Sequence, residues 1–116
     1  MSKLLLALFG LLLACGAQAQ TADTLKKIRD SKSISLGYRT DSPPFSFAAS
    51  DGQPAGYTVD LCKRVVAGIE RALGGGNLTV KWVPVTSANR FDQVASGAID
   101  LECGNTTVTL SRQERV

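Results

Sequence analysis

The spacing of hydrophobic residues changes several times along the chain, and each period predicts a different element. Between residues 58 and 73, apolar side chains recur at steps of three and four residues, with charged residues between them. This is the period of an amphipathic helix with one buried stripe, and the glycines at 74–76 are expected to end it. The stripe consists of Leu61, Cys62, Val65, Val66, Ile69 and Leu73.

Three shorter stretches have the pattern of β-strands. Residues 34–38 are β-prone, residues 78–85 alternate in character up to Pro84, and residues 98–103 form a third short run. Helices lie between and after them in the predicted order. Since strands alternate with helices, the chain is predicted to have an α/β fold, with a mainly parallel sheet, right-handed crossovers and flanking helices.

The remaining segments are expected to be short helices, extended backbone and turns. One short helix is expected within 21–33, capped by Thr21 or Asp23, a second within 87–97, and the start of another around Arg112. Two adjacent prolines keep residues 40–47 extended, and the Gly- and Pro-containing stretch 50–56 is typical of a turn.

The first 19 residues have the layout of a secretion signal. Lys3 precedes an apolar run at 4–14, and Ala17 and Ala19 form a small-x-small cleavage site. The run is too short to cross a bilayer, which takes about 20 residues. The expected mature chain is 20–116, located in the periplasm. A second route remains open, because the residues ending at Cys15 resemble a loose lipobox, which would anchor the chain by a lipid.

Composition excludes several classes of function. The 116 residues include 13 Lys and Arg, 10 Asp and Glu, and no His, for a formal charge of +3. Acidic and basic residues are mixed, which does not favour nucleic-acid binding. Without His there is no Ser-His-Asp or Cys-His arrangement, and neither a metal nor a cofactor is expected. Cys62 and Cys103 either pair as a disulfide or remain buried thiols, and the sequence leaves both open.

Candidate ligand-binding side chains follow each predicted strand, where ligands bind in parallel sheets. Each of these strand ends is followed by an arginine, and Asp41 is the single acid in the loops themselves. Guanidinium groups form a planar fork that matches a carboxylate, and hydroxyls add neutral donors. The set therefore indicates capture of an anion with more than one carboxylate, such as a dicarboxylic amino acid. Its members are Arg39, Thr86, Ser87, Asn89, Arg90, Gly104, Asn105, Thr106, Thr107 and Arg112.

Four segments also resemble a known family, the periplasmic amino-acid-binding proteins of ABC transporters, and within it the glutamate/aspartate-binding branch. They are "TLKKIRDSKSISLGYRTDSPPFSF", "GYTVDLCKRVV", "VPVTSANRFDQVASGAIDLECGNTT" and "SRQERV". The resemblance implies a two-lobed fold that closes over its ligand, a monomer, and membrane permease subunits as partners. Relatives are more than twice as long, so residues 20–116 are expected to be the N-terminal part of an incomplete first lobe.

The resemblance also implies roles for individual residues. Arg112 and Thr107 would hold the α-carboxylate of the ligand, while the loop at Asn105 would meet its α-amino group through a backbone carbonyl. Arg39, Ser87 and Arg90 would hold the side-chain carboxylate, as expected for glutamate or aspartate. The chain departs from the family at Asn105, where relatives commonly carry Ser, so the amino-group assignment depends on a backbone contact.

Two other functions are compatible with the same scaffold. Periplasmic dehydratases acting on cyclohexadienyl acids resemble this fold, and Glu102 is the nearest candidate for the general acid that such an enzyme uses. A sensor domain of a membrane receptor is the other alternative. We expect the binding function, because no partner base for Glu102 is visible in the sequence.

Overall fold

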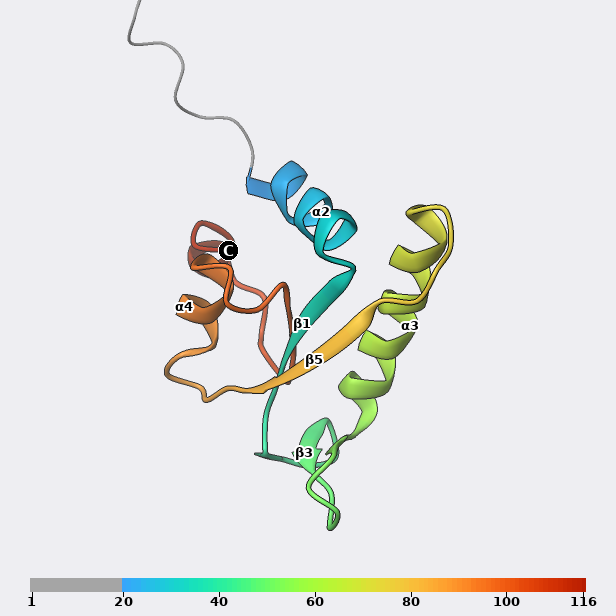
Figure 1. Ribbon diagram of the computed structural model, residues 1–116. Helices are drawn as coiled ribbons and strands as arrows, with labels where there is room; N and C mark the ends of the chain where they lie inside the picture. The colour runs from blue at the N-terminus through green and yellow to red at the C-terminus, as the bar shows by residue number, and fades with distance from the viewer. Residues whose placement is uncertain (1–19) are drawn as a thin grey trace, which may run out of the picture.

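The computed structural model describes residues 20–116 (Figure 1). The expected secretion signal at 1–19 and the lipid-anchored alternative at Cys15 lie outside the described residues. The elements in chain order are α2 (Gln20–Ser31), β1 (Ser33–Tyr38), β2 (Asp41–Ser42), β3 (Ser46–Ala48), β4 (Pro54–Ala55), α3 (Tyr57–Ala72), β5 (Thr79–Pro84), α4 (Arg90–Ala95), β6 (Leu101–Cys103) and α5 (Leu110–Gln113).

The main sheet has three parallel strands in the order β5-β1-β6. Leu36 of β1 lies opposite Trp82 on one side and Leu101 on the other. Figure 1 shows α3 on one side of these strands and α4 on the other. The predicted α/β architecture is confirmed, and its three strands end at the same edge of the sheet.

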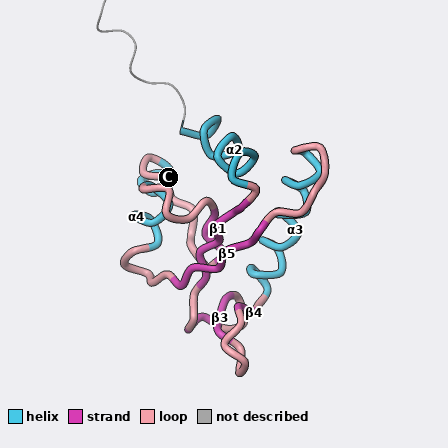
Figure 2. Tube along the Cα trace, in the orientation of Figure 1, coloured by secondary structure: helices cyan, strands magenta, loops and turns pink. Residues whose placement is uncertain are grey.

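A second, antiparallel sheet of β2, β3 and β4 lies beside the start of α3 (Figure 2). The sequence predicted only extended backbone and a turn here. Gly56 joins this sheet to α3 with a φ of 119°, and a Cβ at that position would overlap the carbonyl of Phe45. Only glycine fits this connection, because the backbone is left-handed and closely packed at the same point.

The core lies between α2, α3 and the main sheet. Leu61 and Val65, both predicted to be buried on the helix stripe, are 40% and 47% exposed. The prediction of a single buried stripe was wrong for these two positions, since the sheet covers only the side of α3 that carries Cys62 and Val66. The buried cluster consists of Ile28, Ile34, Leu36, Cys62, Val66 and Cys103.

The strand predicted at 98–103 begins only at Leu101 because Asp100 makes a different set of contacts. Its side chain is 3% exposed, and its carboxylate accepts hydrogen bonds from Ser35 N at 2.8 Å and from Lys27 Nζ at 2.9 Å. Lys27 also donates to the carbonyl of Gly97 at 2.9 Å. These bonds fix the connection from α4 to β6 against α2 and β1.

Cys62 and Cys103 are joined by a disulfide, with their Cα atoms 6.2 Å apart. Of the two alternatives that the sequence left open, the structure contains the pair. The bond ties α3 to the last residue of β6, directly before the loop that begins at Gly104. A cross-link at this position holds one end of that loop in place.

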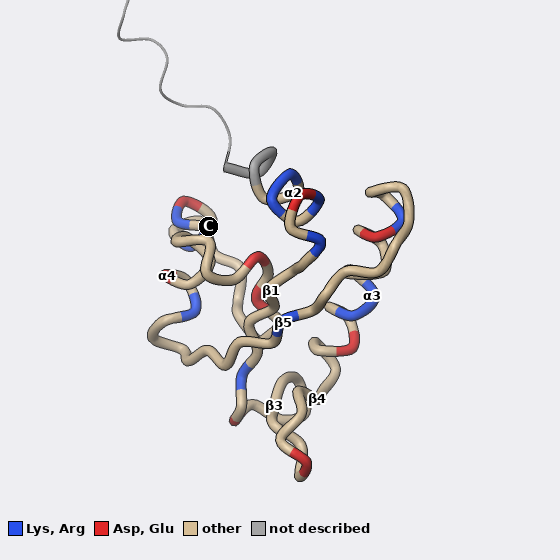
Figure 3. Tube along the Cα trace, in the orientation of Figure 1, with Lys and Arg blue, Asp and Glu red and all other residues tan. Residues whose placement is uncertain are grey.

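Charged residues of both signs are distributed over the described elements (Figure 3). Within residues 20–116, no helix combines the length and the apolar character that a membrane crossing requires.

Candidate functional site

Three loops meet at the carboxyl edge of the main sheet. Arg39 follows β1 directly, residues 85–89 connect β5 to α4, and residues 104–109 connect β6 to α5. Because β1 lies between β5 and β6 and all three strands are parallel, these loops are neighbours.

Arg39 is one of two buried arginines on this edge, the other being Arg90. The Arg39 side chain is 11% exposed, and its guanidinium donates to Ser87 Oγ and to Asp41 Oδ1, each at 2.8 Å. The backbone is held as well, since Arg39 N donates to Ser46 Oγ at 2.9 Å. The structure therefore brings two predicted ligand residues, Arg39 and Ser87, into direct contact.

A pair of reciprocal hydrogen bonds shapes the loop between β5 and α4. Asn89 Oδ1 accepts from Thr86 N at 2.8 Å, and Asn89 N donates to Thr86 Oγ1 at 3.2 Å. Arg90 N then donates to Thr86 O at 3.1 Å as α4 begins. Thr86 and Asn89 are thus positioning residues, and Ser87 and Arg90 are the side chains that this turn presents.

Phe91 is the centre of a cluster of three arginines. The guanidinium carbons of Arg90, Arg112 and Arg115 lie 5.3, 5.1 and 5.4 Å from the centroid of its ring. Aromatic rings attract cations at such distances, and the contacts gather three positive groups at one place. Arg115 is also paired with Asp92 at 2.8 Å, which partly offsets the accumulated charge.

Arg112 is held from two sides. Its Nη1 donates to the backbone carbonyl of Thr107 at 2.7 Å, and its backbone N donates to Thr109 Oγ1 at 3.3 Å, which caps α5. Asn105 and Thr107 are exposed in the preceding loop. Thr107 thus meets Arg112 through its backbone carbonyl.

Several polar atoms at this edge are buried without a hydrogen-bond partner. They include Nε of Arg39, Nε of Arg90 and Oε1 of Glu102. A Cβ at Gly104 would overlap Glu102 Oε1 and lie 3.3 Å from Arg39 Cγ, so these residues surround one glycine. Buried donors without acceptors are costly, so these atoms mark a strained part of the carboxyl edge.

The contacts divide the predicted residues into two groups. Arg39 pairs with Ser87, while Arg90 and Arg112 share the Phe91 ring and Arg112 also bonds to the carbonyl of Thr107. Sequence reasoning missed Phe91 and Arg115. The aromatic residue directly after Arg90 was the available signal for Phe91, whereas the place of Arg115 depends on the path of the chain after α5.

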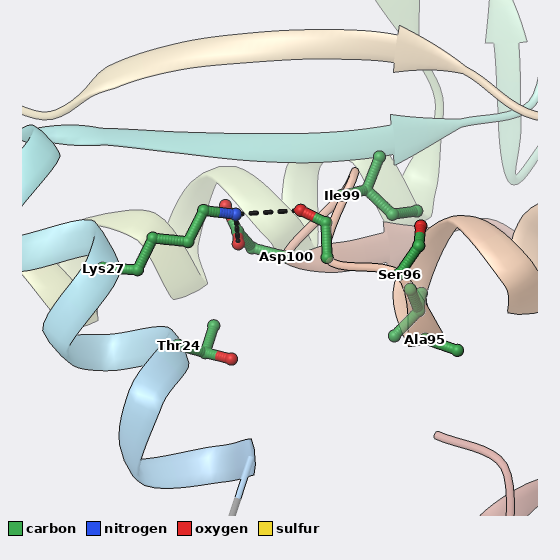
Figure 4. A pocket seen from close by; sticks show the side chains of 8 residues that line it. Thr24, Lys27, Ala95, Ser96, Ile99 and Asp100 are labelled. Carbon is green, nitrogen blue, oxygen red and sulfur yellow. Dashed lines mark hydrogen bonds and ion pairs between the residues drawn. The ribbon is translucent and has the colours of Figure 1, made fainter.

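Two pockets in the described region lie largely apart from these residues, although Arg115 lines the second of them. One, of about 490 Å³, is lined by Thr24 and Lys27 of α2 and by the connection from α4 to β6 (Figure 4). Lys27 and Asp100 already satisfy each other there, so the pocket offers a ligand little unpaired charge. A second, more apolar pocket of about 380 Å³ lies between α2, α3 and Val116.

The described residues hold no group of three or more His, Cys, Asp or Glu side chains arranged for a metal ion. The chemistry at the carboxyl edge is instead that of guanidinium groups, hydroxyls and backbone donors. Such a set binds anions, and carboxylates in particular.

Fold and edge together define a lobe of the periplasmic-binding-protein type. The chain belongs to the bacterial extracellular solute-binding proteins, family 3, which it matches over residues 34–116.

Two curated relatives show how far the similarity extends. The chain is 42% identical over 94 residues to the L-glutamate/L-aspartate-binding protein of Pseudomonas aeruginosa, covering 80% of this chain and 31% of that protein. It is 35% identical over 106 residues to the glutamate/aspartate import solute-binding protein of Escherichia coli K12, covering 91% and 35% respectively. The chain thus spans about a third of the length of these relatives.

A solved structure shows the same fold. The ancestral amino acid-binding protein AncCDT-1, a precursor of cyclohexadienyl dehydratase, superposes with a TM-score of 0.67 at 26% identity. The match covers 78% of this chain and 37% of that protein.

Proposed function

We propose that this chain is the N-terminal part of the first lobe of an extracytoplasmic solute-binding protein that captures glutamate or aspartate for an ABC importer. The observation that carries the proposal is the gathering of Arg39, Arg90 and Arg112 at one sheet edge. The names of the two curated relatives support the same ligand class.

The proposed division of labour keeps Arg39 with Ser87 and Arg112 with Thr107, as their hydrogen bonds pair them, and adds Arg90 to the first pair although it shares the Phe91 ring with Arg112. Arg112, with Thr107, takes the α-carboxylate, and the loop at Asn105 takes the α-amino group through a backbone carbonyl. Arg39, Ser87 and Arg90 take the side-chain carboxylate. The whole protein acts as a periplasmic monomer, closes a second lobe over the ligand and delivers it to membrane permease subunits.

Calorimetric titration of the full-length protein with glutamate, aspartate and glutamine tests the ligand class. We expect both acids to bind at least about tenfold more tightly than glutamine, because a carboxamide lacks the charge that the guanidinium forks match. Equal affinity for glutamine would contradict capture of a second carboxylate.

An Arg90→Ala variant tests the assignment to the side-chain carboxylate. We expect it to weaken glutamate binding about tenfold and to change glutamine binding little, because a carboxamide does not engage the charge of Arg90. Arg71→Ala, an exposed arginine near the end of α3, removes the same charge far from the loops and serves as the matched control. A similar loss for both ligands would show that Arg90 supports the site as a whole.

A dehydratase on the same scaffold is the second candidate, favoured by Glu102. Its Oε1 is buried without a hydrogen-bond partner beside Gly104, and the similar AncCDT-1 is a precursor of such an enzyme. Incubation with a cyclohexadienyl acid, followed by ultraviolet absorbance of the aromatic product, decides the question. Aromatisation at the uncatalysed rate would remove the enzymatic candidate.

A further inference from the structure

The proposed function assigns the Arg39 guanidinium to the ligand's side-chain carboxylate, but in the structure this group already binds the carboxylate of Asp41. Arg39 donates from one terminal nitrogen to Asp41 Oδ1 and from the other to Ser87 Oγ, each at 2.8 Å. Asp41 and the acidic side chain of a ligand both present a carboxylate to Arg39. They therefore compete for the same donors.

The local backbone makes this pairing intrinsic to the chain. Arg39 and Asp41 are two residues apart, on either side of a bend at Thr40 between β1 and β2, and this short separation along the chain keeps the two side chains within reach of each other. Asp41 is also fixed by β2, where it lies opposite Phe47 of β3. The small antiparallel sheet thus positions the Asp41 carboxylate beside Arg39.

The two partners differ sharply in burial. The Arg39 side chain is 11% exposed, whereas that of Asp41 is 67% exposed. If the Asp41 carboxylate leaves, Arg39 keeps its hydrogen bond to Ser87 and its buried position. Asp41 is therefore the partner that moves into solvent at little cost, because ion pairs with one exposed member are weak.

We propose that Asp41 is an internal competitor that occupies Arg39 in the unliganded protein and lowers its affinity for acidic amino acids. This inference rests on the proposed function. A ligand carboxylate replaces the Asp41 carboxylate, so charge is conserved at Arg39 during the exchange. A neutral amide has no charge to exchange and leaves the internal pair intact.

An Asp41→Asn variant of the full-length protein tests this inference, since it keeps an acceptor oxygen but removes the competing charge. We expect glutamate to bind about two- to fivefold more tightly than to the wild type, with glutamine unchanged. Asp51→Asn is the matched control, because Asp51 is exposed, bonds only to Gln53 N among the described contacts, and loses the same charge. It is expected to leave both affinities unchanged, and equal unfolding midpoints would confirm that both variants fold.

The outcomes separate this inference from the proposed function. If the wild type prefers glutamate over glutamine and Asp41→Asn binds glutamate with equal or lower affinity, the competitor is overturned and the proposed function stands. If Asp51→Asn gains as much affinity for glutamate as Asp41→Asn does, the change in net charge explains the effect, and the proposal that Asp41 competes for Arg39 is again overturned. If the wild type shows no preference for acids, the proposed function fails, and the competitor fails with it.

Discussion

An Arg112→Ala variant of the full-length protein is expected to lose affinity for every amino acid by about a hundredfold or more, whether the ligand is acidic or neutral. The proposed partner of Arg112 is the α-carboxylate, which all amino acids share. The Thr107 carbonyl and the Phe91 ring hold this guanidinium in place, and the cap of α5 holds the Arg112 backbone. It therefore loses little further freedom on binding, and its removal leaves the ligand charge without a partner.

Arg115→Ala is the matched control for this variant. Arg115 lies on the same ring as Arg112, at 5.4 Å from its centroid, but it is exposed and paired with Asp92. We expect at most a few-fold change from it, since exposed ion pairs contribute little. Calorimetry with glutamate and glutamine measures both variants. A selective loss of glutamate in Arg112→Ala would reverse the roles proposed for Arg112 and Arg90.

Reduction of the Cys62–Cys103 disulfide is expected to lower the free energy of unfolding by about 4 kcal/mol, on the chain-entropy estimate for a closed loop of this length. The two cysteines are 41 residues apart, and the loop between them includes most of α3 and all of β5 and α4. Urea denaturation of residues 20–116, with and without reductant, measures the difference. Reduction removes the cross-link but keeps both sulfur atoms in the core.

The control for reduction is the double variant Cys62→Ala/Cys103→Ala. Its stability should not respond to reductant, and it should be less stable than the reduced wild type, because both sulfur positions are buried in the core. Thiol counting on unfolded, unreduced protein gives an independent check. Two free thiols, together with a wild-type stability that reductant leaves unchanged, would contradict the cross-link.

The order of helices and strands could be predicted from local patterns. The alternation of 3.6-residue and two-residue periods identified α3, β1 and β5 within about one residue of their observed ends. Patterns of this kind depend on neighbours along the chain, so they are present in the sequence. They did not predict that residues 41–55 pair into a small antiparallel sheet, because that pairing brings together three very short strands.

Burial was predicted less well on α3, because the three-stranded sheet covers only part of the apolar face of this helix. Leu61 and Val65 have the same apolar character as Cys62 and Val66, yet they stay 40% and 47% exposed. An apolar period shows which side chains share one face of a helix. How much of that face is covered depends on the element packed against it.

The sequence by itself determined the α/β order of elements and placed an arginine after each strand of the main sheet. Only the tertiary structure decided which of these side chains meet. Arg39 contacts Ser87 and Asp41, and Arg90 shares the Phe91 ring with Arg112, because strand order and loop path bring distant residues together. Local propensity depends on a few consecutive residues, whereas contacts such as that of Arg39 with Ser87 join residues that are far apart in the sequence and depend on the order of the strands in the sheet.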